Sequence, residues 1–202
     1  RADSTVHSLQ WALPRPRLGY CGVVDGRIDL SIFEALATRH PHWQIVAVGP
    51  VAKIDSASLP QAPNLHWLGQ QPYAQLPALM HGWDCALMPF ALNEATRYIS
   101  PTKTLEYLAA DLPVVSTPVR DVVSSYAHIV SIAHGADAFV QACEATLALD
   151  AEERMRQASV RRAVLQRTSW DLTAAQMRRL LAKAEGDKLL AAAHPRRGAR
   201  SF

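Results

Sequence analysis

The hydrophobic pattern of this 202-residue chain alternates between short, wholly apolar runs and stretches of helical periodicity. Runs such as IVAVG and CALMPF have no polar face, which is typical of parallel strands that helices cover on both sides. The repeated alternation of strand and helix predicts an α/β domain with a doubly wound parallel sheet of about six strands. The expected strands are residues 18–24, 44–48, 64–68, 84–88, 113–116 and 128–132.

Helical patterns occupy the segments between and after these strands. Those between the strands are residues 29–39, 73–81, 101–110, 119–126 and 136–149. Two more, at 152–167 and 170–185, follow the sheet, and Ser169 can cap the last of them. The apolar positions of that helix suggest one docking face, made of Leu172, Met177, Leu180 and Leu181. Residues 1–17 are expected to be a weakly structured lead-in, and residues from about 186 a frayed tail.

The run SPTKTLEYLAADLPVVS at residues 100–116 predicts a helix that turns sharply into a buried strand. Ser100 can cap this helix, and Pro101 then takes its first position, where a missing N–H costs nothing. Asp111 falls where the chain leaves the helix, and Pro113 prevents its continuation. One apolar stripe is expected along the helix, formed by Leu105, Leu108, Ala109 and Leu112.

Lys103 and Glu106 lie on the opposite face of this predicted helix, near its first turn. The free N–H groups and the dipole of a helix N-terminus favour an anion. A cation and a carboxylate at that place suit a sugar nucleotide, the cation for phosphate and the carboxylate for the ribose hydroxyls. The alternative interpretation is an ordinary i,i+3 surface ion pair that stabilises the helix by roughly 0.2–0.5 kcal/mol.

Loops at the carboxyl ends of the expected strands supply the other candidates, because ligands of such sheets bind there. Gly22 leaves room for a phosphate at the backbone, and Arg27 adds a cation to the same loop. Gly69 and Gln70 offer backbone groups to the edge of a base, and Glu94 lies in a long loop of a kind that is often functional. For the loops that contain Gly22 and Gly69, a plain turn is the alternative.

Composition narrows the functional classes. Lys plus Arg is 21 and Asp plus Glu is 18, and much of the small excess lies in the tail, so no basic patch indicates a nucleic-acid partner. Cys21, Cys85 and Cys143 form no CxxC pair, and buried, reduced thiols of a cytosolic protein are expected. The chain lacks GxGxxG, Walker, HExxH and Asp-x-Asp motifs, so we expect neither a dinucleotide cofactor nor a metal site.

The stretch NLHWLGQQPYAQLPALMHGWDCALMPF and the later SPTKTLEYLAADLPVVSTP resemble the donor-binding half of GT-B glycosyltransferases, of the retaining kind that includes bacterial polysaccharide enzymes. The resemblance covers roughly residues 18–170, and its most specific part is the KTLEYLA run. It implies a Rossmann-like GT-B half-domain with extra C-terminal helices. The implied division is a linker at 1–17, a domain that binds the nucleotide sugar at 18–167, a closing helix at 168–186 and a flexible tail at 187–202.

The resemblance also implies a role for each matching residue. Glu106 matches the glutamate that accepts hydrogen bonds from the ribose hydroxyls, and Gly22 matches the glycine near the diphosphate. Arg27 and Lys103 would stabilise the leaving diphosphate without a metal ion, although the spacing of Arg27 from Gly22 is not the commonest one. Ser100, Thr102 and Lys103 would face the diphosphate from the helix N-terminus, and Gly69 and Gln70 would hold the base.

Two positions depart from the family's pattern. Tyr98 stands where many relatives carry a second glutamate close to the donor sugar, so either Glu94 compensates or the sugar site is built differently. Asp111 replaces the usual glycine of the turn after the helix, and Asp tolerates the left-handed conformation that such a turn requires.

The function that these features predict is donor binding by the carboxyl-terminal domain of a longer glycosyltransferase. The enzyme would transfer a sugar from a UDP- or GDP-type donor to a glycan or lipid-linked acceptor in cell-surface polysaccharide synthesis. An N-terminal acceptor domain is the expected partner, and this part alone would be inactive. We expect a cytoplasmic location, at the inner face of the membrane if that other domain associates with it. The alternatives are a sugar-nucleotide epimerase of similar fold and a non-catalytic α/β interaction domain.

Overall fold

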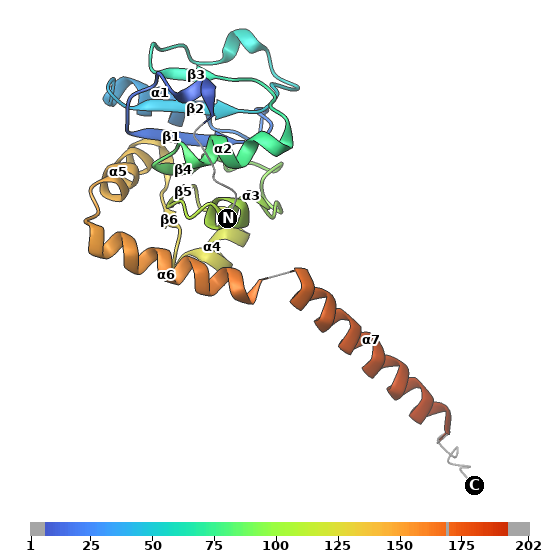
Figure 1. The fold of residues 1–202 in the computed structure, drawn as a ribbon. Coiled ribbons are helices and arrows are strands. Elements are labelled where there is room, and N and C mark those ends of the chain that lie inside the picture. The colour runs from blue at the N-terminus through green and yellow to red at the C-terminus, as the bar shows by residue number, and fades with distance from the viewer. Residues whose placement is uncertain (1–6, 169, 194–202) are drawn as a thin grey trace. The chain divides into compact units, whose positions relative to one another are not determined.

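A parallel sheet is the frame of the fold in the computed structural model, which describes residues 7–168 and 170–193. Its strands are β1 (Arg17–Cys21), β2 (Gln44–Val48), β3 (Leu65–Trp67), β4 (Cys85–Met88), β5 (Val114–Ser116) and β6 (Ser131–Ile132). They form one six-stranded sheet in the order β3-β2-β1-β4-β5-β6, and every pairing is parallel (Figure 1). The predicted doubly wound α/β fold is therefore confirmed.

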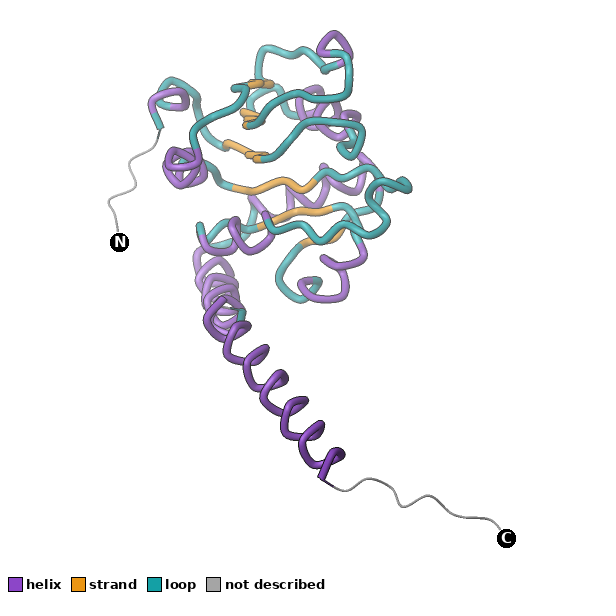
Figure 2. The backbone as a smooth tube through the Cα atoms, turned by 90° about the vertical axis from the view of Figure 1, so that its right-hand side faces the viewer, coloured by secondary structure: helices purple, strands orange, loops and turns teal. Residues whose placement is uncertain are grey.

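Helices cover both faces of this sheet, and loops join them to the strand ends (Figures 1 and 2). The strand order turns around between β1 and β4, so right-handed crossovers on the two sides of this point place their helices on opposite faces. Helices α1 and α5 lie on one face and contact each other there, and α2, α3 and α4 lie on the other. The helices that lie wholly in this part of the chain are α1 (Leu30–Arg39), α2 (Leu76–His81), α3 (Lys103–Ala109), α4 (Arg120–Tyr126) and α5 (Gly135–Leu147). Helix α6 (Ala151–Arg167) begins here and continues past Arg162, where the first compact unit ends.

One predicted strand has its expected boundaries in the structure, and other predicted elements are shorter or divided. The strand expected at 44–48 is β2, because this run is buried on both faces along its whole length. The strand expected at 18–24 ends at Cys21, where the chain leaves the sheet to form a loop. A 3₁₀ turn, Tyr73–Gln75, opens the segment expected to be one helix at 73–81, and β6 retains only two residues of its expected run.

The core lies between the sheet and its helices. Every residue of β1, β2 and β4 is buried, as the wholly apolar runs predicted. Cys21, Cys85 and Cys143 are buried free thiols, in agreement with the prediction of reduced cysteines. The side chains that α1 and α5 bury in this core are Ile32, Phe33, Leu36 and Ala37 from α1, and Phe139, Val140, Cys143 and Thr146 from α5.

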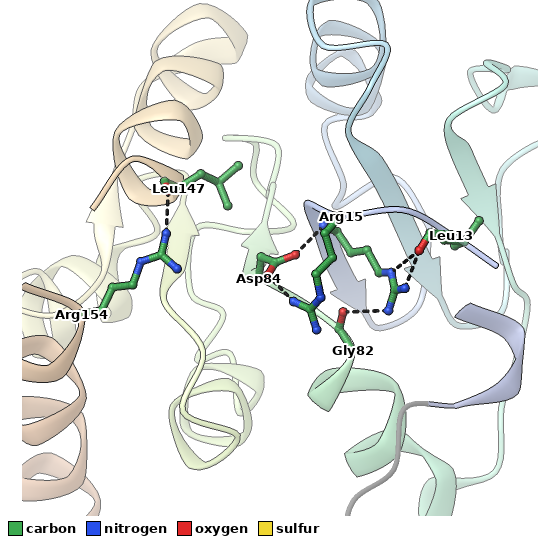
Figure 3. Close-up of polar contacts among 7 residues, drawn as sticks. Leu13, Arg15, Gly82, Asp84, Leu147 and Arg154 are labelled. Atoms are coloured by element: carbon green, nitrogen blue, oxygen red, sulfur yellow. Dashed lines mark hydrogen bonds and ion pairs between the residues drawn. The ribbon is translucent and has the colours of Figure 1, made fainter. Parts of the chain in front are cut away.

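Polar contacts tie the chain together at the amino ends of β1 and β4 (Figure 3). Asp84 pairs with Arg15 and accepts the N–H of Arg17 at 2.8 Å. The largely buried Arg17 guanidinium donates to the carbonyl of Leu13 at 3.0 Å and to that of Gly82 at 3.4 Å. Burial of this guanidinium lowers its pKa. These contacts hold the sheet at the end opposite to the carboxyl ends of its strands.

Asp111 forms the turn between α3 and β5 in the left-handed conformation, with φ 60°. The turn therefore survives the replacement of glycine, as predicted. Arg161 of α6, which is only 5% exposed, donates to the Asp111 carboxylate at 3.0 Å and to its carbonyl at 3.1 Å. The exposed Arg162 lies 3.5 Å from the same carboxylate. These contacts fasten α6 to the C-terminal end of α3.

The chain divides into two compact units, and the second begins at Ala163. This unit contains α7 (Trp170–Ala193), which continues beyond residue 185, where the sequence pattern ended it. Ser169, the expected cap, lies outside the described residues, as do positions 194–202 of the expected tail. The apolar positions of α7 that suggested a docking face, Leu172, Met177, Leu180 and Leu181, are exposed. Within the described residues, no helix is both long and apolar enough to cross a membrane.

Candidate functional site

A cavity of about 330 Å³ opens at the carboxyl ends of β1 and β4. These neighbouring strands flank the point at which the strand order turns around, and doubly wound sheets bind their ligands at this place. The end of β1, the loop after it, the loop after β4 and the first turn of α3 build its walls. Its lining residues are Tyr20, Cys21, Gly22, Val23, Arg27, Ile28, Met88, Phe90, Ile99, Ser100, Pro101, Thr102, Lys103 and Tyr107.

Arg27 lies at the mouth of this cavity in a bidentate ion pair with Asp25. Its Nε donates to Asp25 Oδ1 at 2.9 Å, and its Nη2 donates to Oδ2 at 2.7 Å. The Arg27 side chain is 44% exposed and that of Asp25 is 12% exposed. Hydrogen bonds from Arg27 hold the pKa of Asp25 below its ordinary value. Because no bond from Nη1 is present among the described residues, that nitrogen is available to an anion.

Lys103 reaches the cavity from the first turn of α3, where it is paired with Glu106. Its Nζ lies 2.6 Å from Glu106 Oε2, and the two side chains are 25% and 30% exposed. The pair is therefore partly shielded from water and does not lie free on the surface. Glu106 is next to the cavity through this contact but is not among its lining residues. The pairing is compatible with both interpretations of the sequence, a donor site and a stabilising i,i+3 pair.

Tyr107 forms the floor of the cavity and joins α3 to β1. Its hydroxyl accepts the N–H of Cys21 at 2.7 Å and donates to the Cys21 carbonyl at 3.3 Å. The side chain is fully buried, and burial raises its pKa well above the ordinary value. The sequence analysis assigned no role to Tyr107. The signal that could have pointed to it is its position three residues after Thr104, which puts both side chains on the buried face of α3. The bond fixes the distance between the lysine-bearing helix and the end of β1.

Gly22 is required by packing as well as by any ligand. A Cβ on this residue would lie 2.6 Å from the Tyr20 hydroxyl, which donates to the Val23 carbonyl. The Gly22 N–H already donates to Val48 at 2.9 Å, so a phosphate would have to use other donors. Gly49 adopts φ 143°, and a Cβ there would lie 1.9 Å from the Gly22 carbonyl oxygen. The two glycines thus let the ends of β1 and β2 approach closely.

The structure brings together five of the nine predicted site residues around the cavity: Gly22, Arg27, Ser100, Thr102 and Lys103. The other four, Gly69, Gln70, Glu94 and Glu106, do not line it. Gly69 follows β3, with φ 64°, and its carbonyl accepts the N–H of Gly49 at 2.8 Å. Glu94 is exposed and lies 3.5 Å from Arg97. The roles of all nine residues stay predictions.

The start and the buried face of α3 differ from the sequence prediction. The helix begins at Lys103, with Thr102 as its N-cap and no side-chain cap, so the prediction of Ser100 as the cap is wrong. The chain enters through a tighter turn, in which Thr104 N–H donates to the Pro101 carbonyl at 3.3 Å. Of the expected apolar stripe, Leu108 and Leu112 are buried, and the prediction is wrong for Ala109, which is exposed. Thr104 and Tyr107 are also buried, although the prediction did not include them. The cause is Tyr107, whose hydroxyl finds its partner at the end of β1.

No group of three or more His, Cys, Asp or Glu side chains in the described parts of the chain is arranged to hold a metal ion. The polar groups that the cavity offers are two cations, each beside a carboxylate, and the hydroxyls of Ser100 and Thr102. Such a site suits an anionic ligand with several oxygen acceptors, because charge-assisted bonds to phosphate are strong and directional.

Comparison with known proteins assigns the chain to a family. Residues 16–148 match the family model described as glycosyl transferases group 1. The chain belongs to this family. TuaH of Bacillus subtilis (strain 168), whose name describes a glycosyltransferase of teichuronic acid biosynthesis, is 28% identical over 164 residues. That alignment covers 76% of this chain and 40% of TuaH.

Solved structures share the fold. The alpha,alpha-trehalose 6-phosphate synthase from Burkholderia multivorans superposes with a TM-score of 0.68 at 15% identity, over 96% of this chain and 47% of that one. A trehalose-6-phosphate structure from E. coli, bound with UDP-2-fluoro glucose, gives a TM-score of 0.60 at 13% identity, over 82% of this chain and 44% of that one. At such identities the likeness shows the GT-B type of fold alone. The chain spans less than half the length of each of these relatives.

Proposed function

We propose that this chain is the carboxyl-terminal, donor-binding domain of a retaining GT-B glycosyltransferase. In this proposal residues 18–167 bind a nucleotide-diphosphate sugar, and a separate acceptor domain completes the active site. The sugar would pass to a glycan or lipid-linked acceptor of a cell-surface polysaccharide. The name of TuaH, which refers to teichuronic acid biosynthesis, supports this acceptor class. The UDP sugar analogue in the E. coli neighbour supports a UDP-type donor.

The observation that carries the proposal is the convergence of Arg27 and Lys103 on one cavity at the turning point of the sheet. These cations come from elements far apart in the sequence, and the fold brings both to the lining of one cavity. Because each is held by a neighbouring carboxylate, neither has to be ordered when a ligand arrives. A diphosphate would accept from the free nitrogen of Arg27 and from the ammonium of Lys103.

The same two side chains would assist the chemistry. When the bond between the anomeric carbon and the diphosphate breaks, negative charge grows on the leaving phosphate oxygen. Cations already fixed in a partly water-excluded site stabilise this charge without reorganising. Glu106 would hold the ribose hydroxyls beside Lys103, and Gly69 with Gln70 would receive the base. Two alternatives stay open for the donor sugar. Either Glu94 takes the place of the glutamate that Tyr98 replaces, or the sugar site is built differently.

Calorimetry with UDP and GDP on the full-length protein tests the proposal. We expect Lys103→Met to weaken binding of the preferred diphosphate by about ten- to hundredfold, because a charge-assisted bond contributes roughly 1.5–3 kcal/mol. Lys183→Met removes the same charge at an exposed position of α7 and serves as the matched control. Failure of the unsubstituted protein to bind either nucleotide would contradict the proposal and favour a non-catalytic α/β domain. Turnover of donor without acceptor would favour an epimerase.

A further inference from the structure

The long loop after β4 is fastened to the loop after β1 along one side of the cavity. Ala91 N–H donates to the Arg27 carbonyl at 2.9 Å, and Asp29 N–H donates to the Pro89 carbonyl at 2.8 Å. The backbone of the cationic loop is therefore held by a segment that lies sixty or more positions later in the sequence. The contact joins the cationic loop to the long loop that also carries Glu94 and Tyr98, and it involves a stretch around Asn93 to which no role has been given above.

Asn93 adds a side-chain bond to this backbone contact. Its Nδ2 donates to the Gly26 carbonyl at 2.9 Å. The orientation of Asn93 is fixed in turn by Thr96, which is 4% exposed: Asn93 N–H donates to Thr96 Oγ1 at 3.0 Å, and Thr96 N–H donates to Asn93 Oδ1 at 3.2 Å. The Thr96 hydroxyl also donates to the Ala91 carbonyl. The amide of Asn93 is thus aimed at Gly26 by a compact turn with a buried anchor.

Gly26 separates the two members of the ion pair at the mouth of the cavity. It has no side chain with which to brace this turn, and no atom lies within 4 Å of the place where its Cβ would be. Asp25 and Arg27 bond each other through their side chains, and the backbone contacts Ala91 N–H to the Arg27 carbonyl and Ile28 N–H to the Asp25 carbonyl hold the two ends of this short turn. The bond from Asn93 reaches the peptide between them, and it is therefore well placed to set the position of the pair as a whole.

We propose that Asn93 is a positioning residue for Arg27. This inference rests on the proposed function, because it assigns Arg27 to the diphosphate. Asn93 makes no contact with the ligand in this proposal, and it acts by keeping the Arg27 backbone where the free guanidinium nitrogen faces the cavity. Preorganisation of this kind raises affinity by lowering the ordering cost of binding.

The substitution Asn93→Asp separates positioning from folding. An aspartate keeps the oxygen that accepts from Thr96 N–H, and it replaces the amide group that donates to Gly26 with a negatively charged oxygen that cannot donate. Leu92→Asp is the matched control, since Leu92 is 61% exposed and the same charge is added one residue earlier with the Asn93 contact intact. Both variants are made in the natural background and with Arg27→Met. Calorimetry on the full-length protein then measures UDP, or GDP if it binds more tightly, and the corresponding nucleoside.

We expect Asn93→Asp to weaken diphosphate binding about three- to tenfold more than Leu92→Asp does, with the nucleoside unaffected. In the Arg27→Met background this difference should vanish, because coupled residues give non-additive effects. Equal losses in the two backgrounds, or equal effects of Asn93→Asp and Leu92→Asp, would overturn the inference.

Hydrogen exchange distinguishes a failure of this inference from a failure of the proposed function. Without ligand, Asn93→Asp should speed exchange of the Ala91 amide, which donates to Arg27, relative to the Leu92→Asp control. Unchanged exchange at Ala91 would show that Asn93 does not hold the loops together and would overturn the inference directly. Absence of diphosphate binding by the unsubstituted protein would instead overturn the assignment of the cavity to a nucleotide and, with it, the role of Asn93 toward Arg27.

Discussion

Replacement of Glu106 by alanine will weaken nucleoside diphosphate binding through the ribose. In the proposed site the Glu106 carboxylate accepts hydrogen bonds from ribose hydroxyls, and each such bond to a charged group contributes about 1.5–3 kcal/mol. The carboxylate also lies 2.6 Å from Lys103 Nζ, and its side chain is 30% exposed. The substitution therefore has two consequences of opposite sign.

The second consequence is the release of Lys103. An ion pair that is partly exposed to water is worth roughly 0.2–1 kcal/mol, and a lysine freed from it can give that much back to the phosphate. For one lost ribose bond the net loss for a nucleoside diphosphate is then about 0.5–2.8 kcal/mol, or roughly two- to hundredfold in the dissociation constant. A ligand without ribose hydroxyls experiences only the release of Lys103, so its binding should be unchanged or slightly stronger.

The assay is a cycle of two proteins and two ligands, measured by calorimetry on the full-length protein. The ligands are UDP and 2′,3′-dideoxy-UDP, with the guanosine pair if GDP binds more tightly. Glu152→Ala, at an exposed position in the first turn of α6, controls for the loss of a carboxylate. Glu106→Ala should weaken UDP and spare the dideoxy analogue. An equal effect on both ligands would refute the ribose assignment and favour the structural ion pair.

Two further predictions concern stability. Arg161→Met should lower the free energy of unfolding by about 1.5–3 kcal/mol in urea titrations, because buried Arg161 bonds both the carboxylate and the carbonyl of Asp111. Arg162→Met, at an exposed site, should lower it by less than about 0.5 kcal/mol. Equal losses of stability in the two variants would contradict this reasoning. Burial raises the pKa of Tyr20 above its ordinary value of 10.0, so this hydroxyl keeps its proton in the fold when the unfolded chain has lost it. Stability is then lost as pH rises above 10, and Tyr20→Phe should make this decline shallower by about 1 kcal/mol per pH unit between pH 10 and 11. An unchanged slope in this interval would count against it.

Much of the fold could be predicted from the sequence, because the strands and helices follow from the local period of the apolar residues. Wholly apolar runs predicted parallel strands buried on both faces, and all six were found near their expected places. The same pattern predicted that the loops at the carboxyl ends of strands would carry the site. Gly22 and Arg27 were selected on this basis, Lys103 was selected from the first turn of a predicted helix, and all three line one cavity.

Other features depend on contacts between segments that are distant in the sequence, and the local pattern of residues does not predict such contacts. The buried face of α3 is set by the bond between Tyr107 and Cys21, eighty-six positions apart. The Asn93 contact with Gly26 joins residues sixty-seven positions apart and has no periodic signature. Ser100 looked like a helix cap because Ser followed by Pro fits a helix start, yet the chain enters α3 two residues beyond Pro101 through a tighter turn.

The sequence by itself determined the class of fold, the order of strands and helices along the chain, and the residues that bear charge beside the strand ends. The hydrophobic period and the residue preferences of turns act over a few neighbouring residues, so they can be recognised in the sequence alone. Only the tertiary structure decided that Arg27 and Lys103 line the same cavity, that each is held by its own carboxylate, and that a buried tyrosine joins the lysine-bearing helix to the end of β1. The physical reason is that parallel strands are joined by long crossovers, so residues adjacent at the sheet's carboxyl edge are remote along the chain.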